Sequence, residues 1–121
     1  YTLEIPNDDY AAGLTKAVDG IRQQQYEPVP ERFKYYWGLE GYQGIHTNWK
    51  APNGTVFEVQ FHTPRSYEVK EKQSHPLYRK LHVLDPGSEE AIALQRQIDD
   101  LWRGVPIPPG AAELTADELG L

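Results

Sequence analysis

The chain has no cysteine and no methionine, and these absences set the first limits on what it can be. Without cysteine it can form neither a disulfide nor a thiolate metal site. Because methionine is missing even at position 1, we expect the 121 residues to be a piece of a longer chain. There is no run of about 18 apolar residues and no basic segment followed by an apolar one, so we expect neither a membrane span nor a signal peptide.

Positive charge is also scarce. Twelve lysines and arginines stand against 18 aspartates and glutamates, which gives a formal net charge of −6. A protein that binds duplex nucleic acid needs a cationic face to displace counterions. The charge balance therefore disfavours a general duplex DNA binder, although it leaves room for a local basic pocket. The length favours one domain with a modest core.

The first third of the chain predicts a strand followed by a helix. Alternation over residues 1–5 predicts a strand that ends at Pro6. Apolar residues at helical spacing then predict a helix to about Gln25. Its N-cap candidates are Asn7, Asp8 and Asp9. Residues 27–30 are expected to form a stiff connector, and residues 31–37 a short strand or extended arm.

Helices are predicted after Pro64. We expect one helix over residues 66–73, a second from Pro76 to about Leu84, and a third that Ser88 caps. The buried side of the third helix is predicted to hold Ile92, Leu94, Ile98, Leu101 and Trp102. The domain is placed at residues 1–105, and residues 106–121 form an extended, proline-rich tail, with one helical turn near its end.

Residues 41–64 predict a β-hairpin around the turn Pro52-Asn53-Gly54. A three-residue loop puts the apolar residues of both strands on one face. The predicted pairs on that face are Trp49 with Phe57, Thr47 with Val59, and Ile45 with Phe61. On the other face, Asn48 lies opposite Glu58 and His46 opposite Gln60. Polar side chains therefore collect on one face because side chains alternate along a strand.

Glu58 is the sharpest candidate on the polar face, because a carboxylate is unusual in the middle of a strand. It could bind Mg²⁺ or take a proton from an attacking hydroxyl. An outward carboxylate on a solvated sheet face is an equally good interpretation. His46 could contact a phosphate or a hydroxyl, or lie in water, and Tyr42 could stack on a base or cover the core. The four histidines do not match a zinc spacing.

Lysines and arginines near the hairpin could form the cationic field that a triphosphate needs. A charged helix face in water explains them equally well. The chain contains neither a Gly-rich P-loop nor a dinucleotide-binding glycine pattern. The candidates for phosphate binding are Lys34, Arg65, Lys70, Lys72 and Arg79.

Two motifs, GYQGIHT at residues 41–47 and FEVQFHT at 57–63, resemble the synthetase domain of the RelA/SpoT alarmone enzymes in order and spacing. The variant FEVQFHTP is similar to the toxin-type branch, found in interbacterial effectors and phage-associated proteins. The resemblance covers about residues 1–85. It implies an α+β fold, a mixed sheet flanked by helices as in nucleotidyltransferases. The fold would be N-terminally incomplete, since the family's upstream Arg/Lys cluster and Mg²⁺-binding Asp have no counterpart here.

The resemblance also implies an activity: transfer of pyrophosphate from ATP to a ribose hydroxyl of a nucleotide or of RNA, with Mg²⁺ as cofactor. Glu58 would then bind Mg²⁺ and activate the acceptor hydroxyl. Gln60 and His46 would order the acceptor or its phosphates. Tyr42 would stack on the acceptor base, with His62 also at the acceptor.

Gly38-Leu39-Glu40 stands where guanine-reading members have Lys-Pro-Asn, which favours ADP or ATP over GDP or GTP as acceptor. The family further implies a bacterial toxin that acts in the cytoplasm, including that of a target cell after secretion, and an immunity protein as partner. Two other functions stay open. Glu58 and Gln60 would also suit a metal-dependent nuclease, and the domain could be an inactive interaction module.

Overall fold

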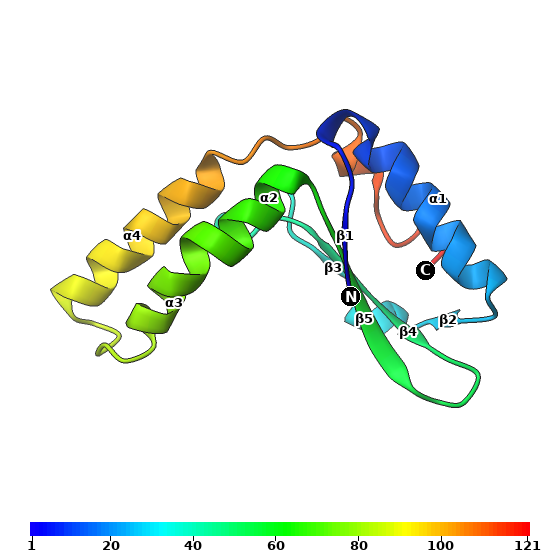
Figure 1. Cartoon of the computed structure of the whole chain (residues 1–121), viewed down its shortest axis with the longest axis horizontal. Helices are drawn as coiled ribbons and strands as arrows, with labels where there is room; N and C mark the ends of the chain where they lie inside the picture. The colour runs from blue at the N-terminus through cyan, green and yellow to red at the C-terminus, as the bar shows by residue number, and fades with distance from the viewer.

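The computed structural model describes residues 1–121 and shows a mixed α+β architecture (Figure 1). Five short strands form one sheet in the order β1-β5-β4-β2, and β3 also pairs with β4. β1 is parallel to β5, and the other pairs are antiparallel, so the predicted mixed sheet is confirmed. The strands are β1 (Thr2–Glu4), β2 (Glu27–Pro28), β3 (Lys34–Tyr35), β4 (Ile45–Lys50) and β5 (Val56–His62).

The β4–β5 hairpin has the predicted register. Trp49 lies opposite Phe57 and Ile45 opposite Phe61, and all the other predicted pairs are also present. Gly54 N–H donates to the Ala51 carbonyl at 2.8 Å, which closes the three-residue turn. Gly54 has φ +88°, a left-handed conformation that glycine adopts without a Cβ clash.

Two glycine substitutions should change stability in opposite directions. Neither Gly54 nor Gly20 has an atom within 4 Å of a Cβ added to it, so only the backbone conformation matters. Gly54→Ala should lower the free energy of unfolding by about 1 kcal/mol because of its positive φ. Gly20 lies inside a helix, so Gly20→Ala should raise it by about 0.5–1 kcal/mol. Urea denaturation measures both, and a change of the same sign in the two variants would contradict this account.

Helix α1 (Tyr10–Gln23) covers the apolar face of the sheet, and Tyr10 ties it there. The buried Tyr10 hydroxyl donates to the Phe61 carbonyl at 2.7 Å and accepts from Trp37 Nε1 at 3.0 Å. Leu14 and Val18 follow on the same side of the helix and are also buried. These contacts fix β5 against α1 and leave the opposite face of the hairpin free of α1.

The start of α1 differs from the prediction of a side-chain cap. A 3-10 turn, Asn7–Asp9, leads into the helix, and Asp9 occupies the N-cap position without a capping side-chain bond. A backbone hydrogen bond is formed there instead: Asp9 N–H donates to the Pro6 carbonyl at 3.0 Å. The predicted connector at residues 27–30 also contains a short strand, β2, which pairs with β4. Val29 N–H donates to the Asn48 carbonyl of β4 at 2.8 Å.

The segment after β5 is helical without the interruption that we predicted. α2 (Pro64–Glu68) continues through a π-helix (Val69–Ser74) into α3 (His75–Leu81). The π-helix ends two residues before Pro76, which has no N–H and whose ring would clash with the carbonyl four residues earlier in a regular α-helix. The wider π turn therefore accommodates the proline, and the chain keeps its direction.

Helix α4 (Glu89–Arg103) lies beside α3 in the same arm of the molecule (Figure 1). Its predicted cap is confirmed, since Ser88 Oγ accepts from Ala91 N–H at 3.2 Å. Its buried residues are Ala91, Ile98 and Trp102. The predicted burial of Ile92 is wrong, because one residue rotates a helix by 100° and turns this side chain, 47% exposed, away from that side.

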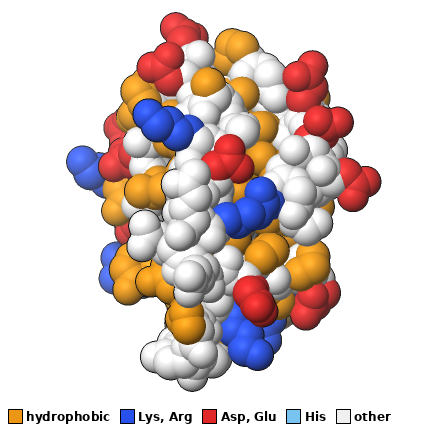
Figure 2. Space-filling model, turned by 90° about the vertical axis from the view of Figure 1, so that its right-hand side faces the viewer, with side chains coloured by type: hydrophobic (Ala, Val, Ile, Leu, Met, Phe, Trp, Pro, Cys, Tyr) orange, Lys and Arg blue, Asp and Glu red, His pale blue; other side chains and the backbone are white.

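The C-terminal segment folds back over α1, where the sequence predicted an extended tail. It contains a 3-10 helix, Ala111–Glu113, and its Ala111, Leu114 and Leu119 join the main core. The Arg22 guanidinium donates to the Leu119 carbonyl and holds the end of the chain to α1. Figure 2 shows this side of the molecule, where acidic side chains are interspersed with lysines, arginines and apolar side chains.

No helix combines the length and the hydrophobicity that crossing a bilayer requires.

Candidate functional site

The candidate site is the polar face of the β4–β5 hairpin, on the side of the sheet opposite α1. Figure 1 shows the sheet and α1 in one arm of the molecule and α3 and α4 in the other. The two arms meet where β5 runs into α2, so the π-helix starts close to the polar face. From it Lys70 reaches back, and its Nζ donates to Gln60 Oε1 at 2.8 Å.

Glu58 is held in position but stays accessible. Gln60 Nε2 donates to Glu58 Oε1 at 2.6 Å. On the other side, His46 Nδ1 lies 3.6 Å from Glu58 Oε2. The Glu58 side chain is still 42% exposed. The carboxylate is thus flanked by polar neighbours and open toward solvent, as a ligand or base must be.

Tyr42 does not stand exposed at a sheet edge. Its ring packs edge-on against Tyr36 and lies 5.0 Å, between centroids, from the ring of buried Trp102. Its hydroxyl points into the polar cluster, at 2.6 Å from His62 Nε2 and 2.8 Å from His46 Nε2. Burial raises the pKa of Tyr42 well above its usual value, and the Glu58 charge adds to this. The hydroxyl therefore stays protonated and acts as a hydrogen-bonding group.

His62 lies behind Tyr42 and is fully buried, at 0% exposure. Its Nδ1 is 2.8 Å from Ser66 Oγ, so both ring nitrogens have partners inside the protein. A Cβ on Gly44 would come within 2.9 Å of His62 Cε1, which explains the glycine at that position. In this arrangement His62 cannot touch an acceptor directly, and any effect on a ligand has to pass through Tyr42.

The buried His62 should make the protein sensitive to acid. Burial lowers the pKa of His62 to about 3, and Lys70 and His46 act in the same direction. The unfolded chain, whose histidine has a pKa near 6.5, therefore binds this proton first as the pH falls. The free energy of unfolding should fall by about 1.4 kcal/mol per pH unit below 6.5, continuing toward pH 3.

Urea denaturation between pH 7 and pH 4 measures this slope. His62→Gln should flatten it by about 1.4 kcal/mol per unit, whatever its effect on stability at pH 7. His75→Gln, which replaces an exposed histidine, is the matched control. An unchanged slope in His62→Gln would show that another group carries the acid sensitivity.

His46 is half-buried between Tyr42 and Glu58. Burial lowers the pKa of His46, Glu58 opposes this effect, and Lys70 reinforces it. A neutral imidazole suits a hydrogen bond to a hydroxyl better than a charge contact with a phosphate.

The structure brings only part of the predicted cationic set together. Lys70 lies within the polar cluster, and Lys34 of β3 is exposed next to His46 in the register. Arg65 instead pairs with Glu68 of its own helix at 3.3 Å. Lys72 and Arg79 are exposed along the helical arm and form no ion pair. A local positive charge beside Gln60 is therefore present, without a five-residue cluster.

The polar face suits a magnesium ion that is bound jointly by the protein and a nucleotide better than one that is bound by protein side chains alone. No group of three or more His, Cys, Asp or Glu side chains is placed to hold a metal ion. In enzymes that act on nucleotides, Mg²⁺ commonly uses one or two carboxylates together with substrate phosphates and waters. Glu58, with its exposed carboxylate, could supply the single protein ligand of such an ion.

Sequence reasoning missed Ser66 and Tyr36. Ser66 was overlooked although Thr63-Pro64-Arg65-Ser66 has the pattern of a helix start: Thr63 Oγ1 accepts from Ser66 N–H at 3.1 Å, and Ser66 Oγ accepts from Thr63 N–H at 2.9 Å. Tyr36 packs edge-on against both Tyr42 and His46. Nothing in the local sequence marks it.

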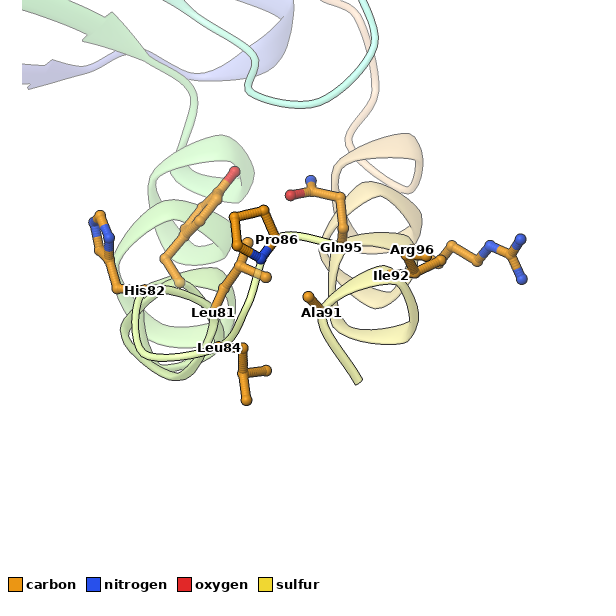
Figure 3. Close-up of a pocket in the computed structure, with 9 residues that line it drawn as sticks. Leu81, His82, Leu84, Pro86, Ala91, Ile92, Gln95 and Arg96 are labelled. Atoms are coloured by element: carbon orange, nitrogen blue, oxygen red, sulfur yellow. The ribbon is translucent and has the colours of Figure 1, made fainter. Parts of the chain in front are cut away.

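A hollow of about 520 Å³ lies elsewhere, between α3 and α4. Figure 3 shows Leu81, Pro86 and Ala91 between the two helices, while His82 and Arg96 point away from them. Its lining is mainly apolar and includes no carboxylate. It therefore lacks the carboxylate that the polar face offers.

Comparisons with known proteins identify a similar fold but do not assign the chain to a family. No protein-family model and no curated protein matches the chain. Among solved structures it resembles a chain from the crystal structure of the complex between the type VI effector Tas1 and its immunity protein, with a TM-score of 0.52 and 19% sequence identity. The match covers 84% of this chain and 62% of that chain, so this chain spans less than two thirds of that protein's length. At this identity the likeness shows the fold alone.

Proposed function

We propose that the chain is the catalytic part of a toxin-type pyrophosphokinase, which moves pyrophosphate from ATP to a ribose hydroxyl. One observation carries the proposal. Glu58, Gln60 and Lys70 form one hydrogen-bonded cluster on the open hairpin face, so an exposed carboxylate and a cation share an amide. This pairing suits phosphoryl transfer, in which a base orients and deprotonates the attacking hydroxyl while positive charge stabilises the phosphate oxygens.

In the proposed reaction the acceptor hydroxyl oxygen attacks the β-phosphorus of ATP. A new oxygen–phosphorus bond forms, the bond to the α-phosphate oxygen breaks, and AMP leaves. Glu58 takes the proton of the hydroxyl, and Lys70 lies 2.8 Å from Gln60, where it can offset phosphate charge. Bound Mg²⁺ would supply further charge compensation at the phosphates, with Glu58 as its protein ligand.

The acceptor is proposed to be an adenine nucleotide, ADP or ATP. The support is the resemblance together with Gly38-Leu39-Glu40 in place of the guanine-reading Lys-Pro-Asn. In the structure this segment is exposed and leads directly to Tyr42, with Gly38 N–H bonded to Gln43 Oε1 at 2.9 Å. An acceptor base on the polar face would lie near this turn.

The biological setting is proposed from the fold neighbour. That protein is a type VI effector solved with its immunity protein. We propose by analogy that this chain belongs to a bacterial toxin that acts in the cytoplasm of a target cell and is neutralised by an immunity protein. Expression of the chain, alone or with any upstream segment of its gene, should stop bacterial growth, and Glu58→Gln should restore it. Harmless expression of a soluble wild-type protein would contradict the toxin role.

The direct test of activity is an incubation with Mg²⁺ and ATP plus ADP, GDP or tRNA, using the chain alone and the chain with any upstream segment of its gene. The proposal expects AMP and a product heavier by one pyrophosphate, with ADP or ATP as the best acceptor. Strand breaks in RNA or plasmid would indicate the nuclease alternative instead. A folded protein that releases no AMP in either form would refute the pyrophosphokinase.

A further inference from the structure

Five side chains form a continuous chain of polar contacts from the helical arm to the open face. Ser66 Oγ lies 2.8 Å from His62 Nδ1, and His62 Nε2 lies 2.6 Å from the Tyr42 hydroxyl. The Tyr42 hydroxyl is 2.8 Å from His46 Nε2, and His46 Nδ1 is 3.6 Å from Glu58 Oε2. The first three residues of this chain are buried or half-buried, and Glu58 is at its accessible end.

A hydroxyl has one hydrogen, and a neutral imidazole carries one N–H and one bare nitrogen. The hydrogens of this chain can all point from Ser66 toward Glu58, or all point the other way. In a third arrangement, the Tyr42 hydroxyl donates to Gln60 Oε1, 3.3 Å away, and accepts from both histidines. The last two arrangements both leave Nδ1 of His46 bare opposite Glu58.

Both ends favour the direction toward Glu58. At the buried end, Ser66 Oγ accepts from Thr63 N–H at 2.9 Å. The hydrogen of the Ser66 hydroxyl can go to His62 Nδ1 at 2.8 Å or to the Thr63 carbonyl at 3.2 Å, and the shorter distance favours His62. At the open end, an ionised carboxylate can only accept. The opposite direction would set the bare nitrogen of His46 against Glu58, which is repulsive.

We propose that His62 and Ser66 are positioning residues that act through Tyr42: they turn the Tyr42 hydrogen toward His46 and so place the proton of His46 on Nδ1, facing Glu58. In this arrangement His62 carries its proton on Nε2. The pair at the helix start thus determines which nitrogen of a histidine on the other strand is a donor. None of this requires a ligand.

The consequence for Glu58 rests on the proposed function, whereas the proton positions do not. With His46 donating toward Oε2 and Gln60 donating to Oε1, each carboxylate oxygen has one partner from the protein. The lone pairs that face solvent stay available for an ion or for a hydroxyl proton. Metal-binding carboxylates are commonly oriented by donors of this kind.

The test is ¹⁵N NMR of the histidine rings in the metal-free chain at neutral pH, which distinguishes the two neutral forms directly. The proposal expects Nδ1–H at His46 and Nε2–H at His62. The result at His46 is informative because an imidazole free in water prefers Nε2–H. Nε2–H at His46, Nδ1–H at His62, or a protonated His46 would each overturn the proposal, and failure to release AMP would bear only on the pyrophosphokinase.

Tyr42→Phe cuts the chain at its centre and keeps the ring that packs on Tyr36 and Trp102. We expect His46 to change from a single Nδ1–H form to a mixture with Nε2–H. Tyr36→Phe is the matched control, since the Tyr36 ring touches His46 while its hydroxyl bonds to no protein group. An unchanged His46 in Tyr42→Phe would show that Glu58 alone sets the proton position. If that variant does not fold, His62 in the wild-type protein still tests the proposal, because its ring nitrogens contact Tyr42 and Ser66 and not Glu58, and Nδ1–H there would overturn it.

Discussion

Glu58→Gln is expected to lower the rate of pyrophosphate transfer by about a hundredfold to ten-thousandfold, the usual contribution of a general base. The amide keeps the size of the side chain and loses the charge and the basic oxygen. Gln60 donates to Glu58 Oε1, and an amide oxygen can still accept that bond. The fold should therefore survive, which circular dichroism and the denaturation midpoint would confirm.

Glu90→Gln is the matched control for this experiment. Glu90 lies exposed in the first turn of α4, away from the polar face, and its substitution should leave the rate unchanged. Two results would contradict the assigned role of Glu58. One is a rate within about threefold of wild type, which is under 1 kcal/mol of activation free energy. The other is loss of activity that merely follows loss of folded protein.

Phe61→Ala should have the largest effect on stability, lowering the free energy of unfolding by about 3–5 kcal/mol. Phe61 is fully buried in the core that α1 and the hairpin share, and its carbonyl accepts from the Tyr10 hydroxyl. Removing the ring leaves a cavity beneath β5. Because Gln60 and His62 flank this position on the same strand, the site should loosen with the core.

Phe57→Ala provides a control with the same change in chemistry. Phe57 faces the same side of β5 but is only partly buried, near the hairpin end, where it packs on Tyr1 and Tyr26. We expect its loss to be about half that of Phe61→Ala or less, since less apolar surface leaves water there. Urea denaturation compares the two, and equal losses would contradict the placement of the core.

The hairpin could be predicted because its information is local. Alternation fixes which residues share a face, and a three-residue loop fixes the parity of the pairing, so Trp49–Phe57 and His46–Gln60 follow from the sequence. The cap at Ser88 is equally local, since its side chain bonds only three residues ahead. Both predictions are confirmed.

The predictions that were wrong concern features that depend on contacts between residues far apart in the sequence. The burial of Ala91 instead of Ile92 depends on which side of α4 meets the rest of the protein, and one residue of rotation reverses it. The return of Leu114 and Leu119 to α1 depends on a core that the local sequence does not show. The continuous helix through Pro76 depends on a π-helix, which has no clear sequence signal.

The residues of the site could be predicted from the sequence, but the extent to which each is buried could not. Alternation correctly put His46, Glu58 and Gln60 on one face. It could not show that His62, on the same face, would be sealed by Tyr42 and Ser66, since that depends on how α2 leaves the strand. The roles of these residues toward a nucleotide stay predictions.

The most direct test of the central claim, that the polar hairpin face binds a magnesium nucleotide, is a two-dimensional NMR titration of the ¹⁵N-labelled chain with Mg²⁺ and ATP. The account predicts shift changes concentrated at His46, Glu58, Gln60 and Lys70, which need both Mg²⁺ and ATP and weaken in Glu58→Gln. Changes confined to the apolar hollow between α3 and α4, or none at millimolar nucleotide, would contradict it.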